Sequence, residues 1–581
     1  MGRKRRAQQS SQPFVQWTKE NPAHEEYYRL QLGLEASELA AFLGKLREQL
    51  PVVFRLNPSE PRFRHVLSDP TRMPVLAGEV RLAPVAWYPD ELAWQVQTTR
   101  SVLKREESSK ALHSFITQAS DAGLVTRQEL VSMLPVLALD VQPGHNVVDL
   151  CAAPGSKSVQ CAEQLQGRGL LLANDADPER AHMLIHQLHR ASAAQVAITN
   201  HQAQFFPSLG SFLFDRVLCD VPCTGDGAMR KIPTKWKTWT ERDAFGVHPL
   251  QLDILTRALA LCKPGGLVVY STCSLNPIEN EAVVAAALKR RRAELVDLEG
   301  LFAARCPGLR VRQGLPVWKV LMRDKSATTP TEFFEVQPGQ KVNGFAPKLT
   351  CFPDGECEAL RRTVRIMPHD QDTGGFYIAL FRVLEQEDTH VPEEKAARKG
   401  PERFVRLTAE SPEYQELREC YGLSADLSPR QLLSVSESLK SKVFYVNREL
   451  ADFLDQYLDS RLAFLSLGVR AFGKNREKGS KELCSFRLCQ EALPFLSSFV
   501  TSRRVESSDQ GLLQTLLRDR TIDLETRVDL ASQLQERGYF VMRFTCCTPA
   551  VELVLLRHPN GRVSSMASDE DSAGLILLLG L

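Results

Sequence analysis

The sequence contains no hydrophobic run that could cross a membrane. Its best candidate, residues 574–581, is far shorter than the roughly 20 residues that a spanning helix needs. The charges of Arg3, Lys4, Arg5 and Arg6 are followed by no apolar segment, which a secretory signal would require. The 14 cysteines show no repeating spacing of the kind found in disulfide-rich secreted domains. We therefore expect a reduced, intracellular protein with no membrane partner.

Metal-binding motifs and an excess of one charge are absent as well. The sequence has no pair of CxxC motifs, and the adjacent Cys546 and Cys547 suit neither a tetrahedral zinc site nor an unstrained disulfide. The 72 basic residues nearly balance the 70 acidic ones, which leaves a net charge of +2. We therefore predict no metal, and any surface that binds nucleic acid must come from local clusters of basic residues.

The chain is too long for one hydrophobic core. Single cores rarely grow beyond about 250–300 residues, so a length of 581 residues predicts several domains. Shifts in composition suggest a disordered basic tail (1–20), a small α+β module (21–125), an α/β domain (126–385), a charged linker (386–409) and a compact carboxyl-terminal domain (410–581).

The predicted α/β domain alternates short apolar strands with helices. The predicted strands are residues 146–150, 169–174, 195–199, 216–219, 266–270 and 374–380. The predicted helices between them are residues 156–165, 179–190 and 251–261. This alternation predicts a doubly wound parallel sheet, which binds its ligands at the carboxyl ends of the strands. Candidate residues at several of these strand ends should therefore meet in one site.

One predicted strand end carries a loop of small residues that opens a helix. The loop consists of Cys151, Ala152, Ala153, Pro154, Gly155, Ser156 and Lys157. Small residues let the backbone approach a ligand, and the first turn of a helix offers unpaired N–H groups. The loop matches neither the phosphate loop nor GxGxxG, which makes ATP or NAD a poorer fit. Asp175 ends the next strand and is placed to accept hydrogen bonds from ribose hydroxyls, which favours a nucleoside cofactor such as S-adenosylmethionine.

Two further strand ends carry one cysteine each. Cys223 lies three residues after Asp220, and Cys273 follows the last predicted parallel strand. A thiolate can form a covalent intermediate, which replaces one difficult reaction step with easier ones. It needs a nearby cation or helix amino end for stabilisation, and Lys157 is a candidate cation. Two buried structural thiols are one alternative, and a reversible disulfide in a thiol redox protein is another.

These segments resemble the Sun-type RNA cytosine-5 methyltransferases, and in particular the large eukaryotic tRNA cytosine-5 methyltransferases. The matching segments in the α/β domain are CAAPGSK (151–157), ANDAD (173–177), LCDVPCTGDGAMRK (218–231), VYSTCSLNPIENEAV (269–283) and RIMPHDQDTGGFYIAL (365–380). Weaker matches on either side are FRLN (54–57), WYPDELAW (87–94), SLGVRAFGKN (466–475) and CSFRLCQEALPFLSSFVTSRR (484–504). The resemblance implies a class I, Rossmann-like methyltransferase core between an α+β RNA-binding module and a β-rich, PUA-like RNA-binding domain.

The resemblance also implies a role for each matching residue. Cys273 is the nucleophile that adds to C6 of cytosine, and Cys223 assists the release of the product. Asp220 contacts the cytosine and lies close to the cofactor, and Lys157 reaches towards both ligands. S-adenosylmethionine supplies the methyl group for C5, and the residues that bind it are the loop 151–157, Asp175, Asp220 and Gln202.

Position 202 departs from the family pattern. Family members usually carry Asp after Asn-His, where it accepts a hydrogen bond from the adenine amine, whereas this chain has Asn200, His201 and Gln202. A glutamine carbonyl also accepts that bond but carries no charge, and charged hydrogen bonds are roughly twice as strong as neutral ones. We therefore expect weaker cofactor binding. A catalytically silent RNA-binding protein with the same fold is the alternative, which the intact Cys223 and Cys273 disfavour.

Basic residues interleaved with aromatic ones predict where RNA contacts the chain. Lys231, Lys235 and Lys237 flank Trp236 and Trp239 beside the first cysteine motif, a pattern that suits phosphate contact and base stacking. Two further basic clusters are residues 289–292 and 470–481.

The resemblance implies tRNA as the partner, with other RNAs as further candidates. The target cytosine has to be unpaired or flipped out of its stack to meet Cys273. We expect the protein to be monomeric. The basic segment Arg3–Arg6 favours the nucleus, including the nucleolus, with the cytoplasm as the alternative compartment.

Overall fold

The computed structural model describes residues 18–69, 82–99, 107–323, 331–385, 404–435, 442–475, 484–534 and 536–581. The basic segment Arg3–Arg6, linker residues 386–403 and residues 476–481 of one predicted basic cluster lie outside the described residues. Within the described ranges no helix has the length and apolarity to span a membrane. Nor do these ranges bring three His, Cys, Asp or Glu side chains together as a metal ion would need.

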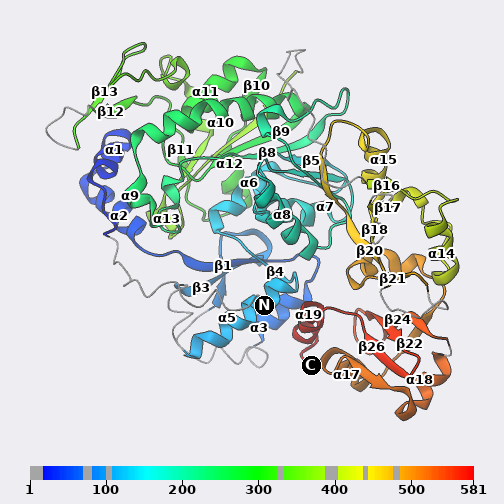
Figure 1. Ribbon diagram of the computed structural model, residues 1–581. Helices are drawn as coiled ribbons and strands as arrows, with labels where there is room; N and C mark the ends of the chain where they lie inside the picture. The colour runs from blue at the N-terminus through cyan, green and yellow to red at the C-terminus, as the bar shows by residue number, and fades with distance from the viewer. Residues whose placement is uncertain are drawn as a thin grey trace, which may run out of the picture.

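The largest sheet occupies the centre of the molecule, with helices on both faces (Figure 1). Five of its strands are parallel and lie side by side in the order β9-β8-β5-β6-β7, as in a doubly wound fold. Their bounds are β5 Asn146–Asp149, β6 Leu170–Asn174, β7 Val196–Thr199, β8 Phe214–Asp220 and β9 Cys262–Thr272. The helices that connect or flank them are α6 Leu130–Leu139, α7 Ser156–Leu165, α8 Pro178–Arg190, α9 Lys235–Thr238, α10 Glu241–Leu261, α11 Glu281–Arg290 and α12 Leu298–Arg305. The predicted α/β class is therefore confirmed.

The parallel strands are joined by antiparallel ones, whose direction the sequence analysis did not predict. β15 (Phe376–Val383) lies beside β9 but runs antiparallel to it, and β14 (Val364–Ile366) pairs antiparallel with β15. β10 (Ala293–Leu295) and β11 (Arg312–Gln313) add two more antiparallel pairs. The chain returns from β14 to β15 through a short turn that contains α13 (Pro368–Gln371), and a connection this short permits only antiparallel pairing.

The amino-terminal region divides into two parts. Its four-stranded sheet has the order β2-β3-β1-β4 and lies against α7 of the α/β domain. The elements of this part are β1 Pro51–Leu56, α3 Arg62–Ser68, β2 Leu82–Pro84, β3 Ala93–Thr99, α5 Glu107–Asp121 and β4 Val125–Arg127. The helices α1 (Pro22–Leu32) and α2 (Ala36–Arg47) instead pack against α9, far along the chain, where they share a hydrophobic cluster (Figure 1).

The carboxyl-terminal region contains two five-stranded sheets. The first comprises β16 Phe404–Arg406, β17 Leu432–Val435, β18 Lys442–Tyr445, β20 Val469–Lys474 and β21 Phe486–Leu488. The second comprises β22 Arg504–Ser507, β23 Thr521–Asp523, β24 Gly538–Phe544, β25 Val551–Arg557 and β26 Arg562–Ser565. The helices around them are α14 Pro412–Tyr421, α15 Arg448–Tyr457, α17 Gln510–Arg518, α18 Val528–Gln533 and α19 Asp569–Leu579. The predicted linker (386–409) is too long, because the apolar Phe404 and Val405 pair with β17.

One strand of the carboxyl-terminal region belongs to the central sheet. β19 (Phe464–Leu467) pairs antiparallel with β7, whereas β20 starts immediately afterwards in a different sheet. Gly468 joins the two strands with φ +50°, and a Cβ added there would lie 2.0 Å from the carbonyl oxygen of Tyr445. Only glycine fits this corner, which brings the carboxyl-terminal region against the edge of the α/β domain.

Candidate active site

Two cysteines face each other beyond the ends of β8 and β9. The Sγ atoms of Cys223 and Cys273 are 3.3 Å apart, and both residues are free thiols that are partly exposed. The hydrogen bond with Cys273, together with burial, raises the pKa of the Cys223 thiol well above its ordinary value. Cys223 therefore favours its protonated form, and its Sγ lies within hydrogen-bond distance of the sulfur of Cys273.

An ion pair lies beside the cysteines. The Nζ of Lys157 donates to Oδ2 of Asp220 at 2.6 Å and to Oγ of Ser132 at 2.7 Å. The hydroxyl of Ser271, two residues before Cys273, donates to Oδ1 of Asp220 at 2.7 Å. The side chain of Asp220 remains 30% exposed while that of Lys157 is only 9% exposed. The carboxylate of Asp220 is thus held from both sides and keeps an open face towards a substrate.

The small-residue loop lies against Asp175, as the sequence predicts. The backbone N–H of Ala153 donates to Oδ2 of Asp175 at 3.1 Å, and that of Asp177 donates to Oδ1 at 3.0 Å. Nη2 of Arg180 lies 3.5 Å from Oδ2, so Oδ1, which accepts only from Asp177, is the oxygen with more acceptor capacity left for a ribose hydroxyl. The residue is only 2% exposed, which orders these acceptors before a ligand arrives.

The same loop opens α7 with free backbone donors. Gly155 is the residue before the helix, with φ +120°, and the N–H groups of Ser156, Lys157 and Ser158 have no acceptor within the helix. A Cβ at Gly155 would lie 3.1 Å from atoms of Leu184 and Gln187 on α8, so the loop packs directly against that helix. Helix amino ends favour negative groups, and the carboxylate of S-adenosylmethionine is such a group. The donors and acceptors here therefore fit this cofactor.

The side chain of Gln202 already takes part in a hydrogen bond within the protein. Its carbonyl oxygen accepts a hydrogen bond from Nε2 of Gln204 at 2.9 Å. The amide of Asn200 donates to the backbone oxygen of Asp175 at 2.6 Å, which fixes this segment beside the ribose position. A cofactor amine must therefore share the carbonyl of Gln202 with Gln204.

The variant Gln202→Asp is expected to bind S-adenosylmethionine more tightly than the wild type. A carboxylate would restore a charged acceptor, and the difference between charged and neutral hydrogen bonds corresponds to a gain of about fivefold. Isothermal titration of the purified proteins measures the dissociation constants. Gln204→Ala, which frees the Gln202 carbonyl without adding charge, is the matched control and should gain less. An unchanged constant in Gln202→Asp would mean that position 202 does not contact the cofactor.

Comparisons with known proteins agree with this geometry. A family model described as 16S rRNA methyltransferase RsmB/F matches residues 136–382, and one described as NSUN2 Pre-PUA domain matches residues 403–501. A multisite-specific tRNA:(cytosine-C(5))-methyltransferase of Saccharomyces cerevisiae is 35% identical, over 86% of this chain and 79% of its own length. The chain belongs to the RsmB/F family of cytosine-C5 methyltransferases.

Two further relatives extend over similar shares of the chain. A tRNA (cytosine(34)-C(5))-methyltransferase of Drosophila melanogaster is 31% identical, over 92% of this chain and 81% of its own length. A multisite-specific tRNA:(cytosine-C(5))-methyltransferase of Schizosaccharomyces pombe is also 31% identical, over 90% of this chain and 88% of its own length. The predicted family is thereby confirmed, and S-adenosylmethionine is the cofactor of this RsmB/F methyltransferase. The Pre-PUA match begins at residue 403, inside the predicted linker.

The RsmB/F site contains a buried residue that the sequence analysis missed. Glu279 accepts hydrogen bonds at Oε2 from the backbone N–H of Thr224 at 2.8 Å and from Nε2 of Gln251 at 3.1 Å. Its Oε1 accepts from the hydroxyls of Thr224 at 2.5 Å and Ser274 at 2.6 Å. Thr224 and Ser274 each follow one of the two cysteines. Glu279 therefore ties the two cysteine loops together.

The surroundings of Glu279 change its acidity. Burial, followed by the nearby carboxylate of Asp226, raises the pKa of Glu279 to about 7. Asp226 itself accepts from the backbone N–H of Leu275 at 2.8 Å and from the indole of Trp239 at 3.2 Å, and also from the hydroxyl of Tyr28 on α1. Glu279 lies in the segment NPIEN, which follows Cys273. The sequence shows this carboxylate but does not show which residues it bonds to.

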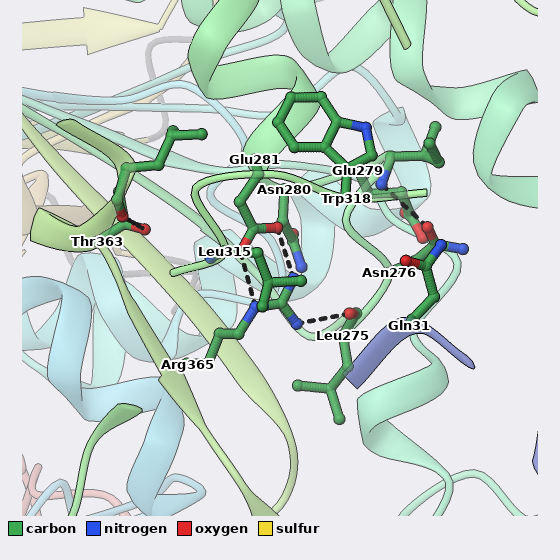
Figure 2. A network of polar contacts seen from close by, with 12 residues as sticks. Gln31, Leu275, Asn276, Glu279, Asn280, Glu281, Leu315, Trp318, Thr363 and Arg365 are labelled. Carbon is green, nitrogen blue, oxygen red and sulfur yellow. Dashed lines mark hydrogen bonds and ion pairs between the residues drawn. The ribbon is translucent and has the colours of Figure 1, made fainter. Parts of the chain in front are cut away.

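A buried arginine supports the segment after Cys273. Figure 2 shows the guanidinium of Arg365 between the carboxylate of Glu281 and the carbonyl of Leu275. Arg365 is 2% exposed, and its Nη1 donates to the oxygen of Leu275 at 2.7 Å. β14, which carries Arg365, and α11, which begins with Glu281, thus hold the loop two residues beyond the nucleophile position.

The prediction that Trp236 and Trp239 stack on RNA bases is wrong. Trp236 is 1% and Trp239 is 4% exposed, and both pack against α1 and α2. The ring of His24 lies 5.5 Å from Trp236 and 5.1 Å from Trp239, edge to face. The sequence could not reveal this contact because α1 lies about two hundred residues earlier. Lys235, directly before Trp236, stays near the site, because its Cε and Sγ of Cys273 both lie within 4 Å of a Cβ built at Gly225.

Proposed function

We propose that this RsmB/F methyltransferase modifies C5 of cytosine in tRNA through a covalent bond between Cys273 and C6. Three relatives named as tRNA cytosine-C5 methyltransferases support the substrate class. The observation that carries the covalent route is the 3.3 Å approach of Cys223 to Cys273 beside the Lys157–Asp220 ion pair. Retention in the nucleus, with Arg3–Arg6 as the import signal, is part of the same proposal.

The first step needs a cytosine held with C6 against Cys273. The open face of Asp220 accepts a hydrogen bond from the exocyclic amine, while Lys157 and Ser271 fix the carboxylate in place. The Cys273 thiolate then donates an electron pair to C6. The C5–C6 double bond opens, and C5 becomes an enamine carbon that attacks an electrophile.

The remaining steps restore the aromatic base. Bound S-adenosylmethionine would supply an electrophilic methyl group to C5, and the bond from that methyl to the sulfonium sulfur would break to leave S-adenosylhomocysteine. A base, either water or a side chain, removes the C5 proton, and that electron pair re-forms the C5–C6 double bond as the bond from C6 to Cys273 breaks. The thiol of Cys223, whose Sγ lies 3.3 Å from the departing sulfur, can protonate it, which favours release of the methylated RNA.

The function is tested by methyl transfer to tRNA. The full-length protein, radiolabelled S-adenosylmethionine and unmodified tRNA transcripts should give labelled RNA, and bisulfite sequencing should place the methyl groups on C5 of cytosines. Cys273→Ala should lose this activity by at least 1,000-fold, because the covalent route is closed. tRNA binding that persists in Cys273→Ala provides the control for folding.

Two results would overturn the proposal. Binding of tRNA by the wild type without methyl transfer would favour the silent RNA-binding protein. Methyl transfer that survives in Cys273→Ala would show that a different residue attacks the base.

A further inference from the structure

A third side chain shares the space beside the cysteine pair. Gly225, two residues after Cys223, has φ +73° and leaves this space open. A Cβ at Gly225 would lie 3.6 Å from Sγ of Cys273 and 3.9 Å from Cε of Lys235. Sγ of Cys273 and Cε of Lys235 therefore border the same small space beside Gly225, and the ammonium group of Lys235 is one bond beyond that Cε.

The position of Lys235 is fixed by its neighbours on α9. Trp236 follows it directly and is buried, and the backbone oxygen of Trp236 accepts a hydrogen bond from Asn21 at 3.0 Å. The backbone oxygen of Lys235 accepts from the N–H of Trp239, also buried, at 2.9 Å. The buried tryptophans thus anchor the short helix, and Lys235 projects from it towards Gly225.

Among the residues that the structure describes, none accepts a hydrogen bond from the ammonium group of Lys235 or forms an ion pair with it. The nearby carboxylates of Asp226 and Glu279 are buried and already accept several hydrogen bonds each. Lys157 differs, because its charge is balanced by Asp220 at 2.6 Å. A half-buried, unbalanced cation beside a nucleophile indicates that an anion arrives with the substrate.

The chemistry of the nucleotide identifies that anion. In a pyrimidine nucleotide with the usual anti orientation of its base, the C6 edge faces the 5′-phosphate. A thiolate that attacks C6 therefore has the 5′-phosphate of the same nucleotide close by. We propose that Lys235 binds the 5′-phosphate of the target cytidine and so orients C6 towards Cys273. This inference rests on the proposed function, because it requires an RNA cytosine in the site.

A thermodynamic cycle between Lys235 and that phosphate tests the proposal. Bisulfite mapping first locates a cytidine that the wild type methylates in tRNA. The same tRNA is then assembled by ligation with a neutral methylphosphonate as the 5′ linkage of that cytidine. Loss of either charge, by Lys235→Ala or by the methylphosphonate, should lower kcat/KM about tenfold. Loss of both should cost no more than loss of one, because the contact can be broken only once.

Controls separate a phosphate contact from a structural effect. Lys341→Ala, an exposed lysine away from the site, and a methylphosphonate at a distant linkage should leave kcat/KM unchanged. Lys235→Arg should retain most activity on the natural linkage and lose it on the methylphosphonate. If the effects of Lys235→Ala and the methylphosphonate multiply instead, the proposed contact is wrong. If the wild type methylates no tRNA cytosine at all, the proposed function itself has failed.

Discussion

Cys223→Ala is expected to remain covalently attached to its RNA. Sγ of Cys223 lies 3.3 Å from the sulfur that must leave C6, so loss of this thiol removes a proton donor for that step. General acids typically contribute 100-fold to 10,000-fold in rate, and we expect turnover to fall by about 1,000-fold. A denaturing gel of the variant with tRNA and S-adenosylmethionine should show a band that contains protein and RNA.

The second cysteine provides the control for this experiment. In the variant that combines Cys223→Ala with Cys273→Ala, the band should vanish, because the attacking thiol is gone. Digestion of the isolated adduct and mass spectrometry should locate the modified nucleotide on the peptide with Cys273. A band that persists without Cys273, or normal turnover in Cys223→Ala, would contradict the roles assigned to the pair.

Glu279→Leu should lower kcat by about 100-fold, even though residue 279 does not contact the substrate. Leucine would leave the N–H of Thr224 and the hydroxyl of Ser274 without their buried acceptor and would release both cysteine loops. A misplacement of about 1 Å in reacting groups is enough for a loss of this size. Methyl transfer at saturating tRNA and S-adenosylmethionine measures kcat.

Glu279→Gln should behave differently. The amide has the shape of a protonated carboxyl group, its oxygen accepts from the N–H of Thr224 and from Gln251, and its NH2 group faces hydroxyls that can rotate to accept. Most activity should survive. The variant should differ instead in how its stability depends on pH, because Glu279 holds a proton up to about pH 7 in the folded state.

The sign of that dependence follows from the raised pKa. The unfolded carboxyl group has a pKa of about 4.5 and the folded one of about 7, so the folded protein binds the extra proton between these values. The stabilisation is complete below about pH 4.5 and is lost as the pH rises through about 7. The melting temperature of the wild type, relative to Glu279→Gln, should therefore fall between pH 5 and pH 8. Asp149, whose pKa burial also raises to about 7, is present in both proteins and cancels.

The two Glu279 variants together distinguish a loss of activity caused by misplaced loops from one caused by unfolding. If Glu279→Leu unfolds, its circular dichroism will show this, and Glu279→Gln still tests the link between the loops. Equal pH dependence in the wild type and Glu279→Gln would mean that Glu279 is ionised in the folded protein. Full activity in a folded Glu279→Leu would mean that the loops hold their positions without it.

The sequence predicted the parts of the site that are local. The loop 151–157, Asp175, Asp220 and the two cysteines stand at strand ends, and parallel strands bring such ends to one edge. The order of these residues along the chain was therefore enough to predict that they lie close together. Their roles in the reaction remain proposals.

Contacts between distant segments could not be predicted in this way. Trp236 and Trp239 suggest an exposed surface when only the adjacent lysines are considered, but α1 and α2 cover them. The hydrogen bond from Tyr28 to Asp226 joins residues 198 positions apart, and no periodic pattern in the sequence predicts it. The antiparallel β15 and the inserted β19 depend on short connections and on tertiary packing, which a pattern of alternating strands and helices does not contain.

The pairing of β19 with β7 has a practical consequence for anyone who shortens this chain. A fragment that ends at residue 385 would contain every proposed catalytic residue, yet it would lose the partner of β7. An uncovered strand of this kind offers unpaired N–H and C=O groups to other molecules, and such edges promote aggregation. Ala463, whose N–H bonds to His201 at 2.9 Å, would be lost with it, beside the cofactor segment. If such a fragment is poorly soluble, the cause would then be the exposed edge of β7 and not a failure of the α/β domain to fold.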